Sequence, residues 1–312
     1  MNIRPLTLHD RHAWSALLAV CFERSPEQTG QIIDWLQKMD TVIAWGAWDD
    51  DQLAAQYACL MRTVWLPDGG AARVGMSLNM AVHPDYRGQG LIKRVAAPVY
   101  NTVRDCGGVA GIGFSNAEGV QVDKHSKSYG YQVIGRMQSL LALVPPRRNT
   151  TQLVLSEQFP PLDLMSSDVH TSPCYHFATS YATLYDRFAA HPFRQYHYGI
   201  WQEAGVLRGV VVFRPAGSRV LHGVSLLAAL GDDLDDLLCH WLSALGDAGY
   251  RYVHVLASPH ASIRHALATI TTLLPLPYSR SPFYLTTKPL CDDLPASWLD
   301  FAAWDCIGGE IL

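Results

Sequence analysis

The sequence predicts an α/β protein of the α+β type, with two tandem domains that each hold a mixed, mostly antiparallel twisted sheet flanked by helices. The chain has 312 residues, about twice the roughly 150 of a typical domain. Its hydrophobic content of 49% supplies the apolar surface that packed cores require. Helical and strand periodicities alternate along the first half, and the same order of elements recurs in the second half. We therefore expect domains at residues 1–145 and 150–312.

The first elements are two helices followed by a strand meander. Asp10 can cap a helix, because its side chain can accept from the first free amides, and a second amphipathic stretch covers residues 32–39. The period then changes to that of strands at 41–48, 53–65 and 73–82. Turns rich in Asp, Pro and Gly separate these strands, which therefore read as antiparallel neighbours.

A helix starts at Leu91 and is predicted from a four-residue repeat of apolar side chains on one face: Leu91, Val95, Val99 and Val103. Pro98 lies inside it and removes one ladder hydrogen bond, so we expect a kink or an early end there. The next predicted elements are a strand at 109–114, a short helix at 117–129, a final strand at 131–143 and a linker at 145–148.

The second half repeats this order with a helix, strands, a helix, a strand, a helix and a last apolar strand. The expected ranges are 181–190, 196–201, 209–213, 219–229, 232–247, 252–256, 262–268 and 283–287.

Charge and cysteine content restrict the class of protein. The net charge of −4 argues against a nucleic-acid partner, which needs a basic surface. No apolar run reaches the length of a membrane helix, so we expect no membrane partner. Seven scattered cysteines without a Cys-x-x-Cys pair argue against structural zinc or a disulfide framework. We therefore expect a cytoplasmic protein without a metal.

The segment Arg87-Gly88-Gln89-Gly90-Leu91 follows a strand and opens a helix. Its glycines allow a tight turn that points several backbone amides at one spot, where the helix dipole favours negative charge. A pyrophosphate fits such a site, although a plain strand-to-helix turn has the same local pattern.

With its surroundings, this segment resembles the GNAT superfamily of acyl-CoA-dependent N-acyltransferases. The resemblance rests on Met80-Ala81-Val82-His83-Pro84-Asp85-Tyr86-Arg87-Gly88-Gln89-Gly90, on Asn116 and on Gly130-Tyr131. It implies acetyl-CoA as cosubstrate, with residues 80–82 along the pantetheine and 87–93 at the pyrophosphate. The implied binding residues are Met80, Ala81, Val82, Arg87, Gly88, Gln89, Gly90, Leu91, Ile92, Lys93 and Asn116. Ile92 departs from the Gly or Ala usual there, and we expect its side chain to point away from the loop amides.

Catalysis of this type is the direct attack of an amine on the thioester, which needs a base, oxyanion donors and an acid for the thiolate. The family's usual acid, a tyrosine, is replaced here by Ser126, while Tyr129 directly precedes Gly130. The acid is therefore left open between Tyr129, Ser126 and none. On the strand before the loop, Ser77 and Asn79 alternate onto one face, and Asn79 could orient the amine.

The corresponding junction in the second half carries Asp232, Asp233, Asp235 and Asp236. These carboxylates suit a helix N-terminus but repel a pyrophosphate, so we expect no CoA there and assign this domain to the acceptor pocket and an interface.

The sequence thus predicts an acetyl-CoA-dependent N-acetyltransferase that acts on a small-molecule amine, as a monomer or homodimer. The tandem arrangement resembles GNAT enzymes that acetylate nucleotide-linked amino sugars. The alternative is a catalytically decayed CoA-binding regulatory or scaffold protein.

Overall fold

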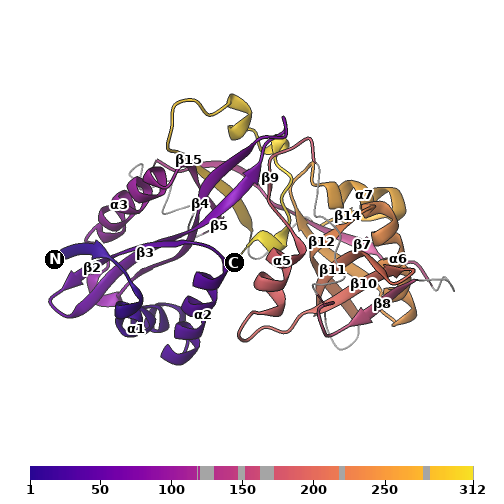
Figure 1. Ribbon diagram of the computed structural model, residues 1–312, viewed down its shortest axis with the longest axis horizontal. Helices are drawn as coiled ribbons and strands as arrows, with labels where there is room; N and C mark the ends of the chain where they lie inside the picture. The colour runs from indigo at the N-terminus through magenta and orange to yellow at the C-terminus, as the bar shows by residue number, and fades with distance from the viewer. Residues whose placement is uncertain are drawn as a thin grey trace. The chain divides into compact units, whose positions relative to one another are not determined.

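The computed structural model describes residues 1–117, 119, 130–146, 152–161, 172–217, 222–276 and 282–311. They divide into two compact units, each with its own sheet and helices, as Figure 1 shows. The first unit contains Met1–Trp65, Gly70–Gly135 and Phe283–Leu299, and the second contains Leu66–Gly69, Arg136–Pro282 and Asp300–Leu312. The predicted fold class is confirmed. None of the described helices is long and apolar enough to cross a membrane.

The sheet of the first unit has the strand order β1-β2-β3-β4-β5-β15-β6. Its strands are β1 (Asn2–Pro5), β2 (Val42–Asp49), β3 (Gln52–Trp65), β4 (Ala71–Val82), β5 (Gly108–Asn116), β6 (Gln132–Arg136) and β15 (Phe283–Pro289). Strands β2 to β4 form the predicted antiparallel meander, because short turns join them. Strand β1, which was not predicted, pairs antiparallel with β2. Strand β5 follows a crossover helix and pairs parallel to β4.

Helices cover both faces of this sheet (Figure 1). On one face α1 (Arg11–Phe22) and α2 (Pro26–Met39) bury Trp14 and Ile33 against side chains of β3 and β4. On the other face α3 (Leu91–Asp105) buries its predicted apolar stripe against β3, including Tyr57. Helix α3 continues through Pro98, so the expectation of an early end there was wrong.

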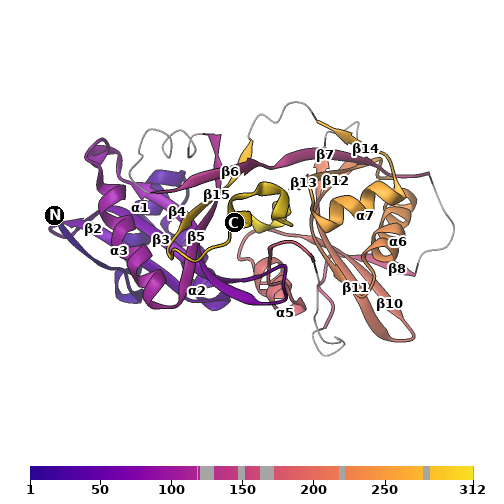
Figure 2. The ribbon, with the colours of Figure 1, turned by 90° about the horizontal axis from the view of Figure 1, so that it is seen from above.

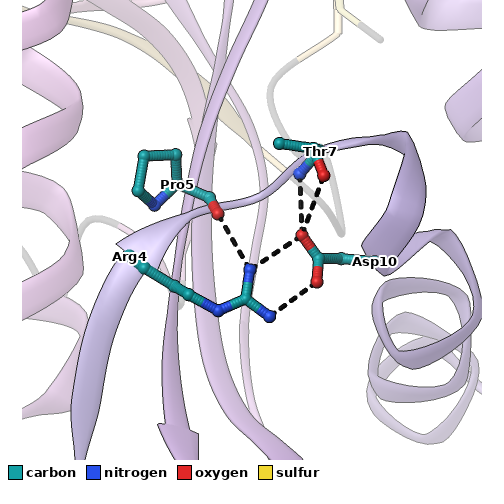
Figure 3. Close-up of polar contacts among 4 residues, drawn as sticks. All are labelled: Arg4, Pro5, Thr7 and Asp10. Carbon is teal, nitrogen blue, oxygen red and sulfur yellow. Dashed lines mark hydrogen bonds and ion pairs between the residues drawn. The ribbon is translucent and has the colours of Figure 1, made fainter.

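Asp10 lies at the start of α1, but its side chain does not cap the helix as predicted. Its carboxylate instead accepts two hydrogen bonds from the Arg4 guanidinium, at 2.6 and 2.9 Å, and one from the Thr7 amide at 2.9 Å. Figure 3 shows the arrangement of these groups. Arg4 also donates to the carbonyl of Pro5. The carboxylate therefore ties β1 to the entry of α1.

This contact predicts a stability that depends on pH. The Arg4 guanidinium, together with the Thr7 amide, lowers the pKa of Asp10 to about 2 from an ordinary value near 3.8. A depressed pKa stabilises the fold above the unfolded-state value, and this stability is lost as the pH falls from about 4 to about 2. We expect Asp10→Asn to lower the free energy of unfolding at pH 7 by about 1–2 kcal/mol, a value reduced by solvent screening of Arg4.

Urea unfolding at pH 7, 4 and 2.5 measures this effect. The wild type should lose the increment between pH 4 and 2.5, whereas Asp10→Asn should lack it at every pH. Asp51→Asn, in the exposed turn after β2, is the control and should keep the wild-type profile. An unchanged profile in Asp10→Asn would contradict the assignment.

The second unit has a seven-stranded sheet of order β14-β7-β13-β12-β11-β10-β8. Its strands are β7 (Gln138–Leu143), β8 (Leu153–Ser156), β10 (His197–Glu203), β11 (Val206–Gly217), β12 (His222–Gly231), β13 (Tyr252–Ala257) and β14 (Leu273–Pro275). The short strand β9 (His176–Phe177), which precedes the helix α5, is not part of this sheet. Helices α6 (Leu234–Asp247) and α7 (Ser262–Ile270) pack on one face around Trp241, and α5 (Tyr181–Leu184) packs on the other (Figure 2).

Two strands belong to other sheets than the sequence suggested. The predicted strand 131–143 is broken at Met137, with β6 in the first sheet and β7 in the second. The last apolar strand, expected in the second domain, is β15 of the first sheet, beside β5 (Figure 2). Leu285 is fully buried there, and the hydroxyls of Thr286 and Thr287 donate to β5 carbonyls at 3.1 Å. The compact units therefore do not coincide with the ranges 1–145 and 150–312.

Candidate active site

The loop between β4 and α3 ends in a left-handed turn. Gly88 and Gly90 have φ of +80° and +67°, and a Cβ at either position would meet nothing within 4 Å. Gly90 is the N-cap of α3, and it has no side chain that could accept from the first-turn amides. These amides therefore remain available to an external anion, at the positive end of a 15-residue helix.

The side chains of the predicted pyrophosphate segment divide into two groups. Arg87, Gln89 and Lys93 are exposed around the turn, where the two cations add positive charge. Leu91 and Ile92 are buried in the core beneath α3. Ile92 thus points away from the loop as expected, and both residues can reach an anion through their backbone amides alone.

The N-terminus of α6 has the opposite character. Its N-cap, Asp233, accepts a hydrogen bond from the Asp236 amide at 3.0 Å, and Asp235 and Asp236 lie in the first turn. The carboxylates therefore occupy the position that an anion takes at a bare helix end.

Strand β4 carries a bulge at Asn79. The register with β3 shifts between Gln56 and Ala58, Asn79 has a φ of +36°, and the Gln56 side-chain amide donates to the Asn79 carbonyl. The bulge breaks the alternation on which the sequence prediction relied. Asn79 borders a small apolar cavity beside α1 and α2, whereas Ser77 and Met80 line a cleft with Tyr57. The prediction that Ser77 and Asn79 share one face was therefore wrong.

Strands β4 and β5 part just before this bulge. In the described residues their parallel register covers Arg73–Met76 and goes no further, while β5 continues beside β15 to Asn116. A cleft lies where they part. It is lined by Tyr57, Ser77, Met80, Gly113, Phe114, Ser115, Gly119, Tyr131 and Thr286.

Three tyrosines and a serine form a hydrogen-bonded chain at this cleft. The Ser77 and Tyr57 hydroxyl oxygens are 2.8 Å apart, Tyr57 bonds Tyr100, and the Tyr100 and Tyr131 oxygens are 2.7 Å apart. Burial raises the pKa of all three phenols, so each is neutral near pH 7. The Lys288 ammonium lies 4.6 Å from the centre of the Tyr100 ring, and burial lowers its pKa.

The structure describes some of the site residues that the sequence predicts, and others lie outside the described residues. Asn116 ends β5, and its side-chain oxygen accepts from the Gly119 amide at 2.8 Å, which ties it to the segment that follows the strand. Tyr129 and Ser126 lie outside the described residues, so their candidacy as the acid remains a prediction. Met80, Ala81 and Val82 lie on β4 beyond the point where it leaves β5.

Sequence reasoning missed several residues that line the cleft or lie behind its lining. Tyr57 and Tyr100 lie within a predicted strand and a predicted helix, and no local pattern separates them from the apolar positions around them. Thr286 and Lys288 come from β15, whose place in the first sheet was not foreseen. Tyr131 had a signal, since it belongs to the Gly130-Tyr131 pair on which the resemblance partly rests.

A comparison with known protein families finds a match in the part of the chain that contains the loop between β4 and α3. Residues 2–133 match the family described as "Acetyltransferase (GNAT) domain". Among curated proteins, no sequence matches the chain.

Solved structures share the fold at low sequence identity. A probable N-acyltransferase from Enterococcus faecalis is 11% identical, with a TM-score of 0.65 over 93% of this chain and 72% of that one. A GCN5-related N-acetyltransferase from Anabaena variabilis is 9% identical, with a TM-score of 0.65 over 92% and 72%. A tandem GNAT protein from the clavulanic acid biosynthesis pathway is 13% identical, with a TM-score of 0.56 over 94% and 99%. Residues 2–133 are therefore identified as an acetyltransferase domain of the GNAT family.

Proposed function

We propose that this protein transfers an acetyl group from acetyl-CoA to the amine of a small molecule, by direct attack in a ternary complex. The observation that carries the proposal is the bare N-terminus of α3 beside a parted pair of strands. The first feature suits a pyrophosphate and the second suits an extended chain of amides, and both occur in CoA.

The turn has the properties that the pyrophosphate requires. Gly88 and Gly90 leave open space where a side chain would stand, and Arg87 and Lys93 supply positive charge. The β4 backbone at Met80, Ala81 and Val82 offers hydrogen-bonding groups to the pantetheine, since β5 does not pair with it there.

The cleft has the properties of an acyl-transfer site. Its described lining offers the hydroxyl group of Ser115, which can donate to a developing oxyanion. Phe114 and Met80 add apolar surface for an acetyl group. A nucleotide-linked amino sugar is the acceptor that we would test first, given the resemblance to tandem enzymes.

A CoA-binding protein that has lost catalysis is the second candidate, and one observation favours it. None of the described residues that line the cleft carries a carboxylate or an imidazole, the usual general bases. Under this alternative the loop binds CoA but no amine is acetylated.

Two measurements on the full chain test the proposal. We expect acetyl-CoA to raise the thermal midpoint, because a ligand that binds the native state stabilises it by about 2.7 kcal/mol at 100 times its Kd. We also expect release of CoA thiol in the presence of a UDP-linked amino sugar, D-glucosamine, L-lysine or tyramine. No shift with millimolar acetyl-CoA would contradict both candidates. A shift without thiol release on any amine would contradict the transferase and support the alternative.

Other parts of the proposal concern the second unit and the compartment. We propose that the second unit does not bind CoA, which the carboxylates of the α6 N-terminus support, and that it contributes to acceptor binding and to an interface. A cytoplasmic location is proposed as well, in keeping with seven cysteines that are all free thiols.

A further inference from the structure

Four hydroxyl groups from four separate segments form one continuous chain. Ser77 comes from β4, Tyr57 from β3, Tyr100 from α3, and Tyr131 is the residue directly before β6. The hydrogen bonds Ser77–Tyr57, Tyr57–Tyr100 and Tyr100–Tyr131 link them in that order. Each inner hydroxyl has two oxygen neighbours, so it can accept from one and donate to the other. All the hydroxyls of such a chain donate in the same direction, and they can all switch together to donate in the opposite direction.

Both ends of the chain open into the same cleft. Ser77, Tyr57 and Tyr131 line the cleft, whereas Tyr100 is 2% exposed and lies behind them. Strand β5 makes room for this arrangement at Gly111, where a Cβ would stand 2.7 Å from the Tyr100 ring and 2.9 Å from the Tyr131 hydroxyl. The inner hydroxyl thus connects two points of the cleft through the protein interior.

The surroundings keep the inner hydroxyl in place. Tyr100 packs edge-on against Tyr57 and Tyr131, with ring centroids 5.6 and 5.8 Å apart. The Lys288 ammonium lies 4.6 Å from the centre of the same ring, a cation–π distance. Because burial holds all three phenols in the neutral form, every hydroxyl keeps the proton that it needs to donate.

Acyl transfer requires a proton to move between two points of such a cleft. When an amine attacks the thioester carbon, the C–N bond forms, the nitrogen becomes positive and the carbonyl oxygen becomes negative. The oxyanion then re-forms the C=O bond and expels the thiolate, so the nitrogen must lose one proton and the sulfur must gain one. No oxidant or further reactant takes part in this balance.

Resting on the proposed function, we propose that the chain Ser77–Tyr57–Tyr100–Tyr131 carries this proton from the amine nitrogen to the leaving sulfur. Ser77 accepts the proton from nitrogen and passes its own to Tyr57, Tyr57 passes one to Tyr100, Tyr100 to Tyr131, and Tyr131 to the thiolate. Every hydroxyl ends with one proton, and rotation of the hydroxyls restores the starting direction. Tyr100 acts here as a positioning residue that touches neither substrate.

Tyr100→Phe tests the relay, because it removes the inner hydroxyl and leaves the cleft lining intact. With acetyl-CoA and an amine of the panel above, we expect kcat to fall about 10- to 100-fold. The KM for acetyl-CoA should stay within about twofold, since a loss that is confined to the chemical step leaves binding unchanged. Plots of kcat against the deuterium fraction of the solvent should be bowed in the wild type, where several protons move together, and linear in Tyr100→Phe.

Further variants separate a relay from a packing role. Ser77→Ala and Tyr131→Phe cut the chain at its ends and should also lower kcat, and the double variant Tyr100→Phe/Tyr131→Phe should be no slower than the slower single variant. Tyr198→Phe, a buried tyrosine of the second unit, is the matched control and should match the wild type.

A wild-type kcat with a bowed plot in Tyr100→Phe would overturn the relay while leaving the proposed function intact. If Tyr100→Phe does not fold, a wild-type kcat in Tyr131→Phe overturns it equally. Thiol release by the wild type distinguishes the two failures: if the wild type acetylates none of the amines, the proposed function and the relay fall together.

Discussion

Gly90→Glu is expected to abolish acetyl-CoA binding. The substitution places a carboxylate at the bare N-terminus of α3, where the pyrophosphate is proposed to lie. A like charge about 4 Å away costs roughly 4 kcal/mol at an effective dielectric of about 20, so we expect the Kd to rise at least about 100-fold. The φ of +67° adds roughly 1–2 kcal/mol of backbone strain. Titration calorimetry with acetyl-CoA measures the binding, and urea unfolding measures the strain.

The far end of the same helix supplies the control. Gly107 also has a positive φ, +79°, and a Cβ there would meet nothing within 4 Å. Gly107→Glu therefore introduces the same side chain at a similar backbone conformation, but at the C-terminus of α3. It should lose comparable stability and keep the wild-type Kd. A folded Gly90→Glu protein that binds acetyl-CoA normally would exclude the loop as the pyrophosphate site.

A chain that ends after residue 145 is expected not to form a stable acetyl-CoA-binding domain. It lacks β15, which stands between β5 and β6 in the first sheet. The pairing from Phe283 to Pro289 against Asn116 to Ala110 is lost, together with the fully buried Leu285. Trp298, which is 1% exposed and donates to Thr287, is lost as well. The fragment should show no cooperative unfolding transition in urea and no thermal shift with acetyl-CoA.

A fusion that restores the strand serves as the control. The fusion joins residues 1–135 through a flexible Gly/Ser linker to residues 282–299. It contains every segment of the first unit, together with Leu66–Gly69 and Pro282 of the second unit. We expect this fusion to unfold cooperatively and to bind acetyl-CoA. A fragment 1–145 that folds and binds as well as the fusion would show that β15 is dispensable for the site.

Local patterns of the sequence predicted most of the helices and strands. The four-residue repeat of α3 and the alternation of the meander depend on which face is buried, and this is encoded within a few residues. The turn at Gly88 and Gly90 was predictable for the same reason, because glycine is the residue that adopts a positive φ most readily.

Pairing over long distances was not predictable in this way. An apolar run such as 283–289 indicates a buried strand but does not identify its neighbour, and here the neighbour is β5. The bulge at Asn79 likewise depends on the Gln56 side chain of the adjacent strand. The hydroxyl chain needs side chains from four segments to meet, so no single stretch of sequence indicates it.

The late position of β15 has a consequence for synthesis on the ribosome. Phe283 pairs with Asn116, so the first sheet cannot be completed when β5 is made. It must wait until the whole segment between β5 and β15, residues 117–282, has been synthesised. During that interval the edge of β5 lacks its partner, and an unpaired edge can associate with another chain. The first sheet, most of which lies in the first half of this sequence, thus becomes complete only after β15 has been made. Nascent chains of this protein are therefore expected to need a chaperone more than those of a single-domain relative whose sheet closes within its own segment.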